Sequence, residues 1–260
     1  AAQAVLARTW AWANTHRFKV DGYNLCSDTQ CQVYKDPSKA NQKIKTAINK
    51  TAGKVLIWNQ KPINTVYHAT NGGVMASVDE AWSINQVPYL QMRLDGPKKW
   101  SRKVDLPLSN EKYLKSFLFS ESDAFGADHP LFRWNRTLES SQISKQLHQA
   151  KKGSSSFYPK TIKAVSRGTS GRVTSLKIDG INGSGISLKL DDIRRVLRQL
   201  PSTLFVVKEN KDGKWLFSGG GFGHGAGMSQ SGAIELAKNG WSTKQILSHY
   251  YPKTKYGFLP

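Results

Sequence analysis

The sequence predicts an α+β fold, in which short strands and helices are mixed without a regular βαβ order. Two observations carry this prediction. The first 17 residues are rich in Ala, Val and Leu and contain neither Gly nor Pro, which is typical of a helix. The second half of the chain holds several short apolar runs of strand type, followed by two helical segments. With 260 residues the chain can bury a core as one large domain or as two small lobes.

The amino-terminal half is expected to alternate between helices and one hairpin. A helical pattern over 43–53 ends at Gly53, a residue that often terminates helices. The apolar runs 54–58 and 63–67 read as two strands of a hairpin, joined by Asn59–Pro62. Further helices are predicted over 110–119 and 142–152.

The carboxy-terminal half begins after Lys151–Ser156, a stretch that reads as a linker or flexible loop. A helix over 191–198 starts with acidic residues, as the helix dipole favours, and the last helices span 229–240 and 242–251. Asn239 and Gly240 are expected to form the turn between them, with Ser242 as the N-cap. Strands are predicted over 162–165, 173–178, 186–190, 204–207 and 214–217.

The chain is strongly basic, with 38 Lys and Arg against 18 Asp and Glu and a net charge of +20. Seven basic residues and no acid lie between Ser141 and Arg172, which predicts a positive field that attracts polyanions, or simply a solvated face. No nucleic-acid motif accompanies the charge. The eight scattered tryptophans are consistent with stacking on sugar rings, at least as well as with stacking on nucleic-acid bases. No apolar run approaches the roughly 18 residues of a membrane helix.

The segment Gly219–Gln230 is the most informative stretch of the sequence. Six glycines, ending with Gly227, surround a single His224, and Met228, Ser229 and Gln230 follow. Because glycine allows positive φ and close backbone approach, this segment predicts the open floor of a binding site. The alternative is a tight chain reversal in which the histidine is merely packed.

Cys26 and Cys31 are the only cysteines, and they lie five positions apart. This spacing suits a small disulfide loop or half of a zinc site. Two unpaired buried thiols are the third option.

Five segments, spread over nearly the whole chain, resemble the stage II sporulation protein D and LytB amidase-enhancer family. Ala2–Trp10 is similar to the AQAVAARTY helix of that family, and the Cys26–Tyr34 loop to one ending in QVY. Tyr67–Gly73, with Glu80–Trp82 after it, is similar to the YHSTSGG segment and the acidic residue and Trp that follow it. Phe222–Ala233 and His249–Tyr251 resemble the carboxy-terminal hallmark.

The resemblance implies an extracytoplasmic protein, in the periplasm or cell wall, that acts on peptidoglycan. It would be a lytic transglycosylase or a partner of cell-wall amidases. In the catalytic members a glutamate acts as general acid and base, and the family places it just before the Ala2–Trp10 helix. We therefore expect the chain to be a fragment whose catalytic acid lies before Ala1. Glu80 is the fallback, against the plainer interpretation of a surface or helix-capping carboxylate.

The resemblance also implies one family domain over 1–260, with lobes 1–150 and 151–260 as one division, around a central groove. A missing amino-terminal segment would anchor the protein at the membrane periphery. An oxidising compartment favours the Cys26–Cys31 disulfide, with zinc at these cysteines second and no other cofactor expected. Nucleic acid is not an expected partner, although polyanion binding stays a third hypothesis. The substrate-binding residues are expected to share one cleft: Arg8, His68, Thr70, Gly72, Gly73, His224, Ser229, Gln230, Tyr250 and Tyr251.

Overall fold

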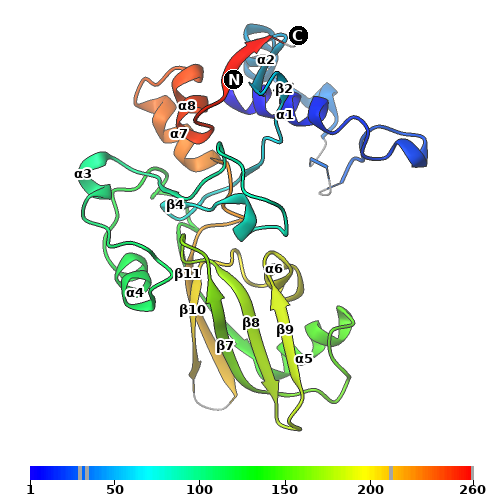
Figure 1. The fold of residues 1–260 in the computed structure, drawn as a ribbon, viewed down its shortest axis with the longest axis vertical. Helices are drawn as coiled ribbons and strands as arrows, with labels where there is room; N and C mark the ends of the chain where they lie inside the picture. Colours follow the sequence, from blue (N-terminus) through cyan, green and yellow to red (C-terminus); the bar gives the residue numbers. More distant parts are fainter. Residues whose placement is uncertain (29–30, 33–34, 211–212, 259–260) are drawn as a thin grey trace. The chain divides into compact units, whose positions relative to one another are not determined.

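The computed structural model describes residues 1–28, 31–32, 35–210 and 213–258. The last residues of the QVY run, Val33 and Tyr34, lie outside these ranges. Helices and short strands alternate through the chain, which confirms the predicted α+β class (Figure 1). Its contacts divide the chain into two compact units, Ala1–Val66 with Ala237–Pro260, and Tyr67–Leu236. This division differs from the lobe boundary considered at residue 150.

The first unit packs helices against a small antiparallel sheet. Strand β1 (Lys54–Trp58) lies between β13 (Lys255–Phe258) and β2 (Lys61–Pro62). Thr9 in helix α1 accepts a hydrogen bond at Oγ1 from the Leu56 amide at 3.0 Å, so the helix is tied directly to the sheet. The helices of this unit are α1 (Ala2–Ala13), α2 (Gln42–Lys50) and α8 (Thr243–Tyr250), with 3-10 turns at Lys19–Asp21 and Pro37–Lys39.

The hairpin of this unit is tighter than the sequence predicts. Ile57 pairs with Pro62 and Trp58 with Lys61, so only Asn59 and Gln60 form the turn. Both turn residues have positive φ, 48° and 62°, as two-residue hairpins of the primed type require. The strand expected over 63–67 is wrong over most of its length: the pairing with β1 ends at Pro62, with one further hydrogen bond from the Ile63 amide to the Leu56 carbonyl at 3.2 Å, and Tyr67 begins another strand.

The second unit holds two three-stranded antiparallel sheets. One has the order β7–β8–β9 and the other β10–β11–β6. One apolar core collects side chains from all six strands and from two helices, α5 and α6. The elements are β6 (Arg133–Glu139), α5 (Ser140–Gln149), β7 (Pro159–Arg167), β8 (Val173–Gly180), β9 (Gly185–Lys189), α6 (Asp192–Val196), β10 (Phe205–Asn210) and β11 (Lys214–Gly220).

A second apolar cluster of this unit is formed mainly by the segment 74–132, which precedes β6. It includes Trp100, Leu114 and Phe132. The elements of this part are β3 (Tyr67–His68), β4 (Val74–Met75), a 3-10 turn at Val78–Glu80, β5 (Arg93–Leu94), α3 (Lys98–Ser101) and α4 (Glu111–Phe119). Strand β12 (Met228–Ser229) leads into α7 (Gln230–Lys238).

Two further predictions differ from the structure, and one long strand was not predicted. The helix expected over 191–198 covers only Asp192–Val196, and Asp191 binds two arginines instead of capping it. Gly219 and Gly220 belong to strand β11, not to the glycine loop. Strand β6 has no counterpart among the predictions. The turn at Asn239–Gly240 and the N-cap at Ser242 are confirmed, since Gly240 has φ +82° and Ser242 forms a capping box with Gln245.

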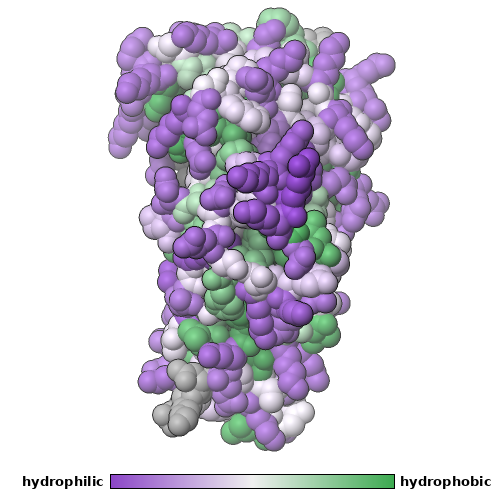
Figure 2. All heavy atoms as spheres, turned by 90° about the vertical axis from the view of Figure 1, so that its left-hand side faces the viewer, coloured by the Kyte–Doolittle hydropathy of each residue, from purple (hydrophilic) through white to green (hydrophobic). Residues whose placement is uncertain are grey.

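The visible face in Figure 2 is covered mainly by hydrophilic side chains, as the composition leads one to expect. No helix among the described residues is long and apolar enough to cross a membrane.

Candidate functional site

Two turns of the second unit, 68–73 and 221–227, lie side by side. Strands β3 and β12 pair in parallel, with Tyr67 opposite Met228 and His68 opposite Ser229. Beyond this pair, the Phe222 amide donates to the Thr70 carbonyl at 2.7 Å and the Thr70 amide donates back at 3.3 Å. The two histidine-bearing segments that the sequence singled out are therefore neighbours.

Glycines in the second turn permit close packing. Gly223 has φ +110°, and a Cβ there would lie 2.6 Å from the Cβ of His68. Gly225 has φ +82°, and a Cβ there would lie 2.3 Å from the guanidinium carbon of Arg172. Both contacts are too short for any side chain, so the glycines are required by their neighbours. The open floor expected from the sequence is instead closely packed at these positions.

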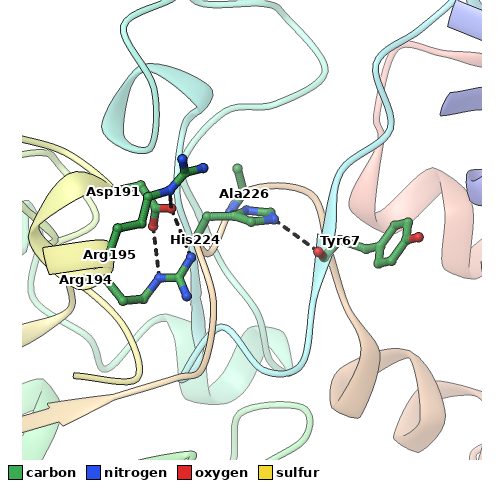
Figure 3. Close-up of polar contacts among 6 residues, drawn as sticks. All are labelled: Tyr67, Asp191, Arg194, Arg195, His224 and Ala226. Carbon is green, nitrogen blue, oxygen red and sulfur yellow. Dashed lines mark hydrogen bonds and ion pairs between the residues drawn. The ribbon is translucent and has the colours of Figure 1, made fainter. Parts of the chain in front are cut away.

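The rings of His68 and His224 meet edge to face, with 5.2 Å between their centroids. His224 uses both nitrogens: Nε2–H donates to the Tyr67 carbonyl at 3.0 Å, and Nδ1 accepts from the Ala226 amide at 3.2 Å (Figure 3). In His68, Nδ1–H donates to the Ala226 carbonyl at 3.1 Å. Its Nε2 is then a lone-pair acceptor, and it has no hydrogen-bond partner among the described residues.

Burial keeps both imidazoles neutral. It is the largest cause that lowers the pKa of His224 to about 4, an effect that the nearby Asp191 carboxylate partly offsets. The pKa of His68 lies well below its usual value of 6.5, because of burial first and then the His224 and Arg172 charges. Near neutral pH neither ring carries a charge, so this pair cannot act as a cationic site.

His224 is half-buried; its ring contacts an aromatic ring and lies near an ion-pair cluster. The Trp82 ring lies against it with 4.6 Å between centroids. Asp191 accepts from Arg194 Nε at 3.0 Å and Nη2 at 2.9 Å, and from Arg195 Nε at 3.2 Å (Figure 3). These contacts fix Asp191 and position both guanidinium groups near the glycine turn.

Beneath the turns lies Arg172, whose side chain is fully buried. Its Nη1 donates to the Val74 carbonyl at 3.1 Å and to Ser170 Oγ at 3.2 Å, and Nη2 donates to the Asn71 carbonyl at 3.0 Å. Burial lowers the pKa of Arg172 to about 10, against the raising effect of the Glu80 charge, so the group remains a cation at neutral pH. It thereby links the first turn to the 168–172 turn.

Glu80, the fallback catalytic acid, is buried and fully engaged. Its Oε1 accepts from Thr169 Oγ1 at 3.0 Å and from the Ser170 amide at 3.1 Å, and its Oε2 accepts from Ser170 Oγ. Glu80 is 3% exposed, so the alternative of a surface carboxylate is wrong, whereas a catalytic role of Glu80 stays a prediction. Glu80 anchors the 168–172 turn.

The other expected site residues of this unit lie in the first turn or just after the second, in β12 and α7. Thr70 is buried, and its Oγ1 accepts from the Gly72 amide at 3.4 Å. The Gly73 amide donates to Asn71 Oδ1 at 2.8 Å. Ser229 is buried and accepts from the Gly232 amide at 3.3 Å. Gln230 is half-buried and begins α7.

Arg8, Tyr250 and Tyr251 belong to the first unit and hold it together. Arg8 Nη1 donates to the carbonyls of Thr51 at 2.6 Å and Lys54 at 2.9 Å. The Tyr251 hydroxyl donates to the Val66 carbonyl, and Tyr250 is 1% exposed. That these three residues share a cleft with His68 and His224 stays a prediction.

Cys26 and Cys31 form a disulfide. Among the described residues, no group of three or more His, Cys, Asp and Glu side chains could hold a metal ion. The zinc alternative at this pair would require free thiolates, which a disulfide does not provide.

The sequence does not reveal that two arginines of the basic run, the half-buried Arg167 and the buried Arg172, bind main-chain carbonyls. Arg167 and Arg172 were counted in the basic run up to residue 172, but Arg167 donates to the Gly171 and Phe205 carbonyls and Arg172 is enclosed. Both serve as donors for main-chain carbonyls, not as part of a solvated field. The acid-free run does not reveal this, because the Phe205, Val74 and Asn71 carbonyls that these arginines bind lie in other segments.

Replacement of Gly225 by Ala should destabilise the protein much more than Gly183→Ala. Both glycines have similar φ, +82° and +79°, but a Cβ at 183 meets nothing within 4 Å. The control therefore isolates the backbone cost, of about 1–2 kcal/mol, and the contact with Arg172 should add about 1–3 kcal/mol for Gly225→Ala. Equal losses in urea unfolding would contradict the packing argument.

The two site histidines should titrate below pH 6.5 in the folded protein. Because the unfolded chain binds protons that the folded chain does not, their contribution to stability is complete above about pH 6.5 and falls as the pH drops toward 4. NMR titration of the His ring protons, assigned with His68→Gln and His224→Gln, measures the midpoints. Midpoints equal to those in urea would contradict the burial argument.

Comparison with known proteins supports the motif resemblance. A family model described as stage II sporulation protein matches residues 1–58, and one described as a domain of unknown function, DUF8618, matches residues 76–227. The amidase enhancer of Bacillus subtilis is 28% identical over 97% of this chain, which spans 37% of that relative. The stage II sporulation protein D of the same organism is 28% identical over 98% of the chain, and that of Bacillus amyloliquefaciens 30% over 96%.

The chain spans 67% and 65% of these two sporulation proteins. The similarity thus extends over nearly all of this chain, on both sides of the two turns, and includes relatives of both names. On this evidence the chain belongs to the stage II sporulation protein D and amidase-enhancer family, as a distant member.

Proposed function

We propose that this chain is the glycan-binding part of an extracytoplasmic protein that cleaves peptidoglycan strands. The observation that carries the proposal is the surface beside the glycine turn, where the half-buried Trp82 and His224 rings contact each other at a tilt of 47° and Phe222 is 42% exposed. Aromatic faces of this kind suit the apolar faces of sugar rings, while neighbouring polar groups bind hydroxyls. Family membership and the Cys26–Cys31 disulfide support a cell-wall location.

In this proposal the histidines position the turn and do not touch the sugar. Both nitrogens of His224 are engaged by main-chain groups, and His68 is only 5% exposed. Their neutral rings fix the Tyr67 and Ala226 peptide groups, and through these the position of Phe222. The substrate-binding role predicted for His68 and His224 is therefore proposed here as an indirect one.

Cleavage requires a general acid, and three carboxylates near the turns are held by hydrogen bonds to other side chains or main-chain groups. Glu80 is engaged by three donors, Asp191 by two arginines and Asp95 by Asn71 at 2.6 Å. We infer that the acid lies outside these 260 residues. It would protonate the glycosidic oxygen as the C1–O bond breaks; the 6-hydroxyl of the sugar attacks the anomeric carbon and passes its proton to the carboxylate that remains, so that the acid is regenerated and an anhydro ring forms without water.

Phe222→Ala should weaken binding to purified sacculi by about fivefold or more, the scale expected from losing one aromatic contact. Phe119→Ala is the matched control, because Phe119 is 64% exposed at the end of α4 and belongs to neither turn. A pelleting assay gives both affinities. Equal affinities would contradict the placement of the sugar at the Trp82–Phe222 surface.

The 260-residue chain should bind sacculi without releasing anhydro-muropeptides, whereas the complete gene product should release them. Loss of a general acid removes about 10²–10⁴-fold in rate, so turnover by the chain should escape detection in muropeptide analysis. Equal release by both proteins would contradict an external acid, and Glu80→Gln would then test Glu80. Binding without cleavage by either protein would indicate a non-catalytic amidase enhancer. Preference for DNA over sacculi, with a steep salt dependence, would indicate a polyanion-binding protein.

A further inference from the structure

A pocket of about 410 Å³ opens in the second unit next to the glycine turn. Its wall is tied to that turn, because the Gly223 amide donates to the Pro201 carbonyl at 3.0 Å. The pocket is lined by four arginines, one glutamine and four apolar residues: Arg136, Arg194, Arg195, Arg198, Gln199, Leu131, Leu200, Pro201 and Phe222.

Two of the four arginines share one carboxylate, and the four come from β6, from α6 and from the segment after α6. Arg136 projects from β6, Arg194 and Arg195 lie on α6, and Arg198 follows that helix. Asp191 pairs with Arg194 and Arg195, and its side chain is only 7% exposed, whereas that of Arg195 is 66% exposed. Asp191 is not among the lining residues, so the lining of the pocket holds four arginines and no acidic residue.

This concentration of like charge opposes folding unless something compensates it. One buried carboxylate compensates one of the four positive charges. It also holds Arg194 and Arg195 in fixed positions, so a ligand that binds these side chains loses less free energy to ordering them. An arginine fork matches the two oxygens of a carboxylate, and such charge-assisted pairs are among the strong hydrogen bonds. Phe222 and Leu131 supply an apolar wall for the group that carries the anion.

We propose that this pocket binds a carboxylate of the peptidoglycan strand whose sugar lies on the Trp82–Phe222 surface. Phe222 belongs to both the pocket lining and that surface, so one ligand can occupy both. The identity of the ligand rests on the proposed function, whereas the oxyanion chemistry rests on the pocket alone.

The test uses Arg136→Gln with Arg198→Gln, because neither residue pairs with the buried Asp191. Lys145→Gln with Lys189→Gln is the matched control: it removes the same two charges from exposed positions outside the pocket. The small probes are N-acetylmuramic acid and N-acetylglucosamine, which differ by a carboxylate-bearing lactyl group, titrated by NMR. The large probe is purified sacculi in three forms: untreated, with carboxylates amidated by carbodiimide coupling, and stripped of phosphodiester-linked polymers by hydrofluoric acid.

The pocket variant should bind N-acetylmuramic acid and untreated sacculi about tenfold or more weakly than the control variant, since charged hydrogen bonds are lost. The difference should vanish for N-acetylglucosamine and for amidated sacculi, and persist after hydrofluoric acid. Equal binding by the two variants would overturn the proposal. A difference that hydrofluoric acid abolishes would overturn the carboxylate in favour of a phosphodiester polymer.

Failure of the proposed function gives a separate result. If neither variant binds sacculi while the pocket variant alone loses N-acetylmuramic acid, the oxyanion pocket stands and the peptidoglycan function does not. Thermal melting of both variants, compared with the parent protein, verifies that the lost affinity does not come from unfolding.

Discussion

The buried guanidinium of Arg172 is the constraint around which the second unit is arranged. Removing an arginine from water is costly, and the cost is acceptable only because main-chain carbonyls of Asn71 and Val74 and the nearby Glu80 charge replace the lost hydration. The first turn must therefore stay where its carbonyls face Arg172. Gly225 is required at the other side, because any side chain there would occupy the space of the guanidinium.

The same arrangement explains why two neighbouring histidines have different environments. Ala226 is the shared partner: its amide donates to His224 and its carbonyl accepts from His68. The main-chain amide and carbonyl of this one residue thus set the tautomers of both rings, with the proton on Nε2 in His224 and on Nδ1 in His68. These hydrogen bonds also fix the orientation of the half-buried His224 ring against the Trp82 ring.

Local signals in the sequence predicted the elements that local chemistry determines. The strand Lys54–Trp58 and the capping box at Ser242 agree with the structure because an apolar run and a cap need only nearby residues. The pairing of β6 could not be predicted: Arg133–Glu139 alternates two buried apolar residues with polar ones too weakly to stand out, and its partner β11 lies far along the chain. The sequence placed His68 and His224 in one hypothesis but gave Arg172 the role of a surface charge. The carbonyls of Asn71 and Val74 that Arg172 binds lie far away along the chain.

The parallel contact between β3 and β12 is only two residues long, yet the groups it brings together are far apart in sequence; His68 and Ala226, for example, are separated by 158 positions. Contacts of such long range close a large loop, whose entropy must be lost before the contact stabilises anything. During synthesis the first turn leaves the ribosome long before the glycine segment 221–227, so it cannot form its contacts with that segment at once. The turns should therefore be among the last parts of this unit to form, after the two sheets have collapsed around their own core.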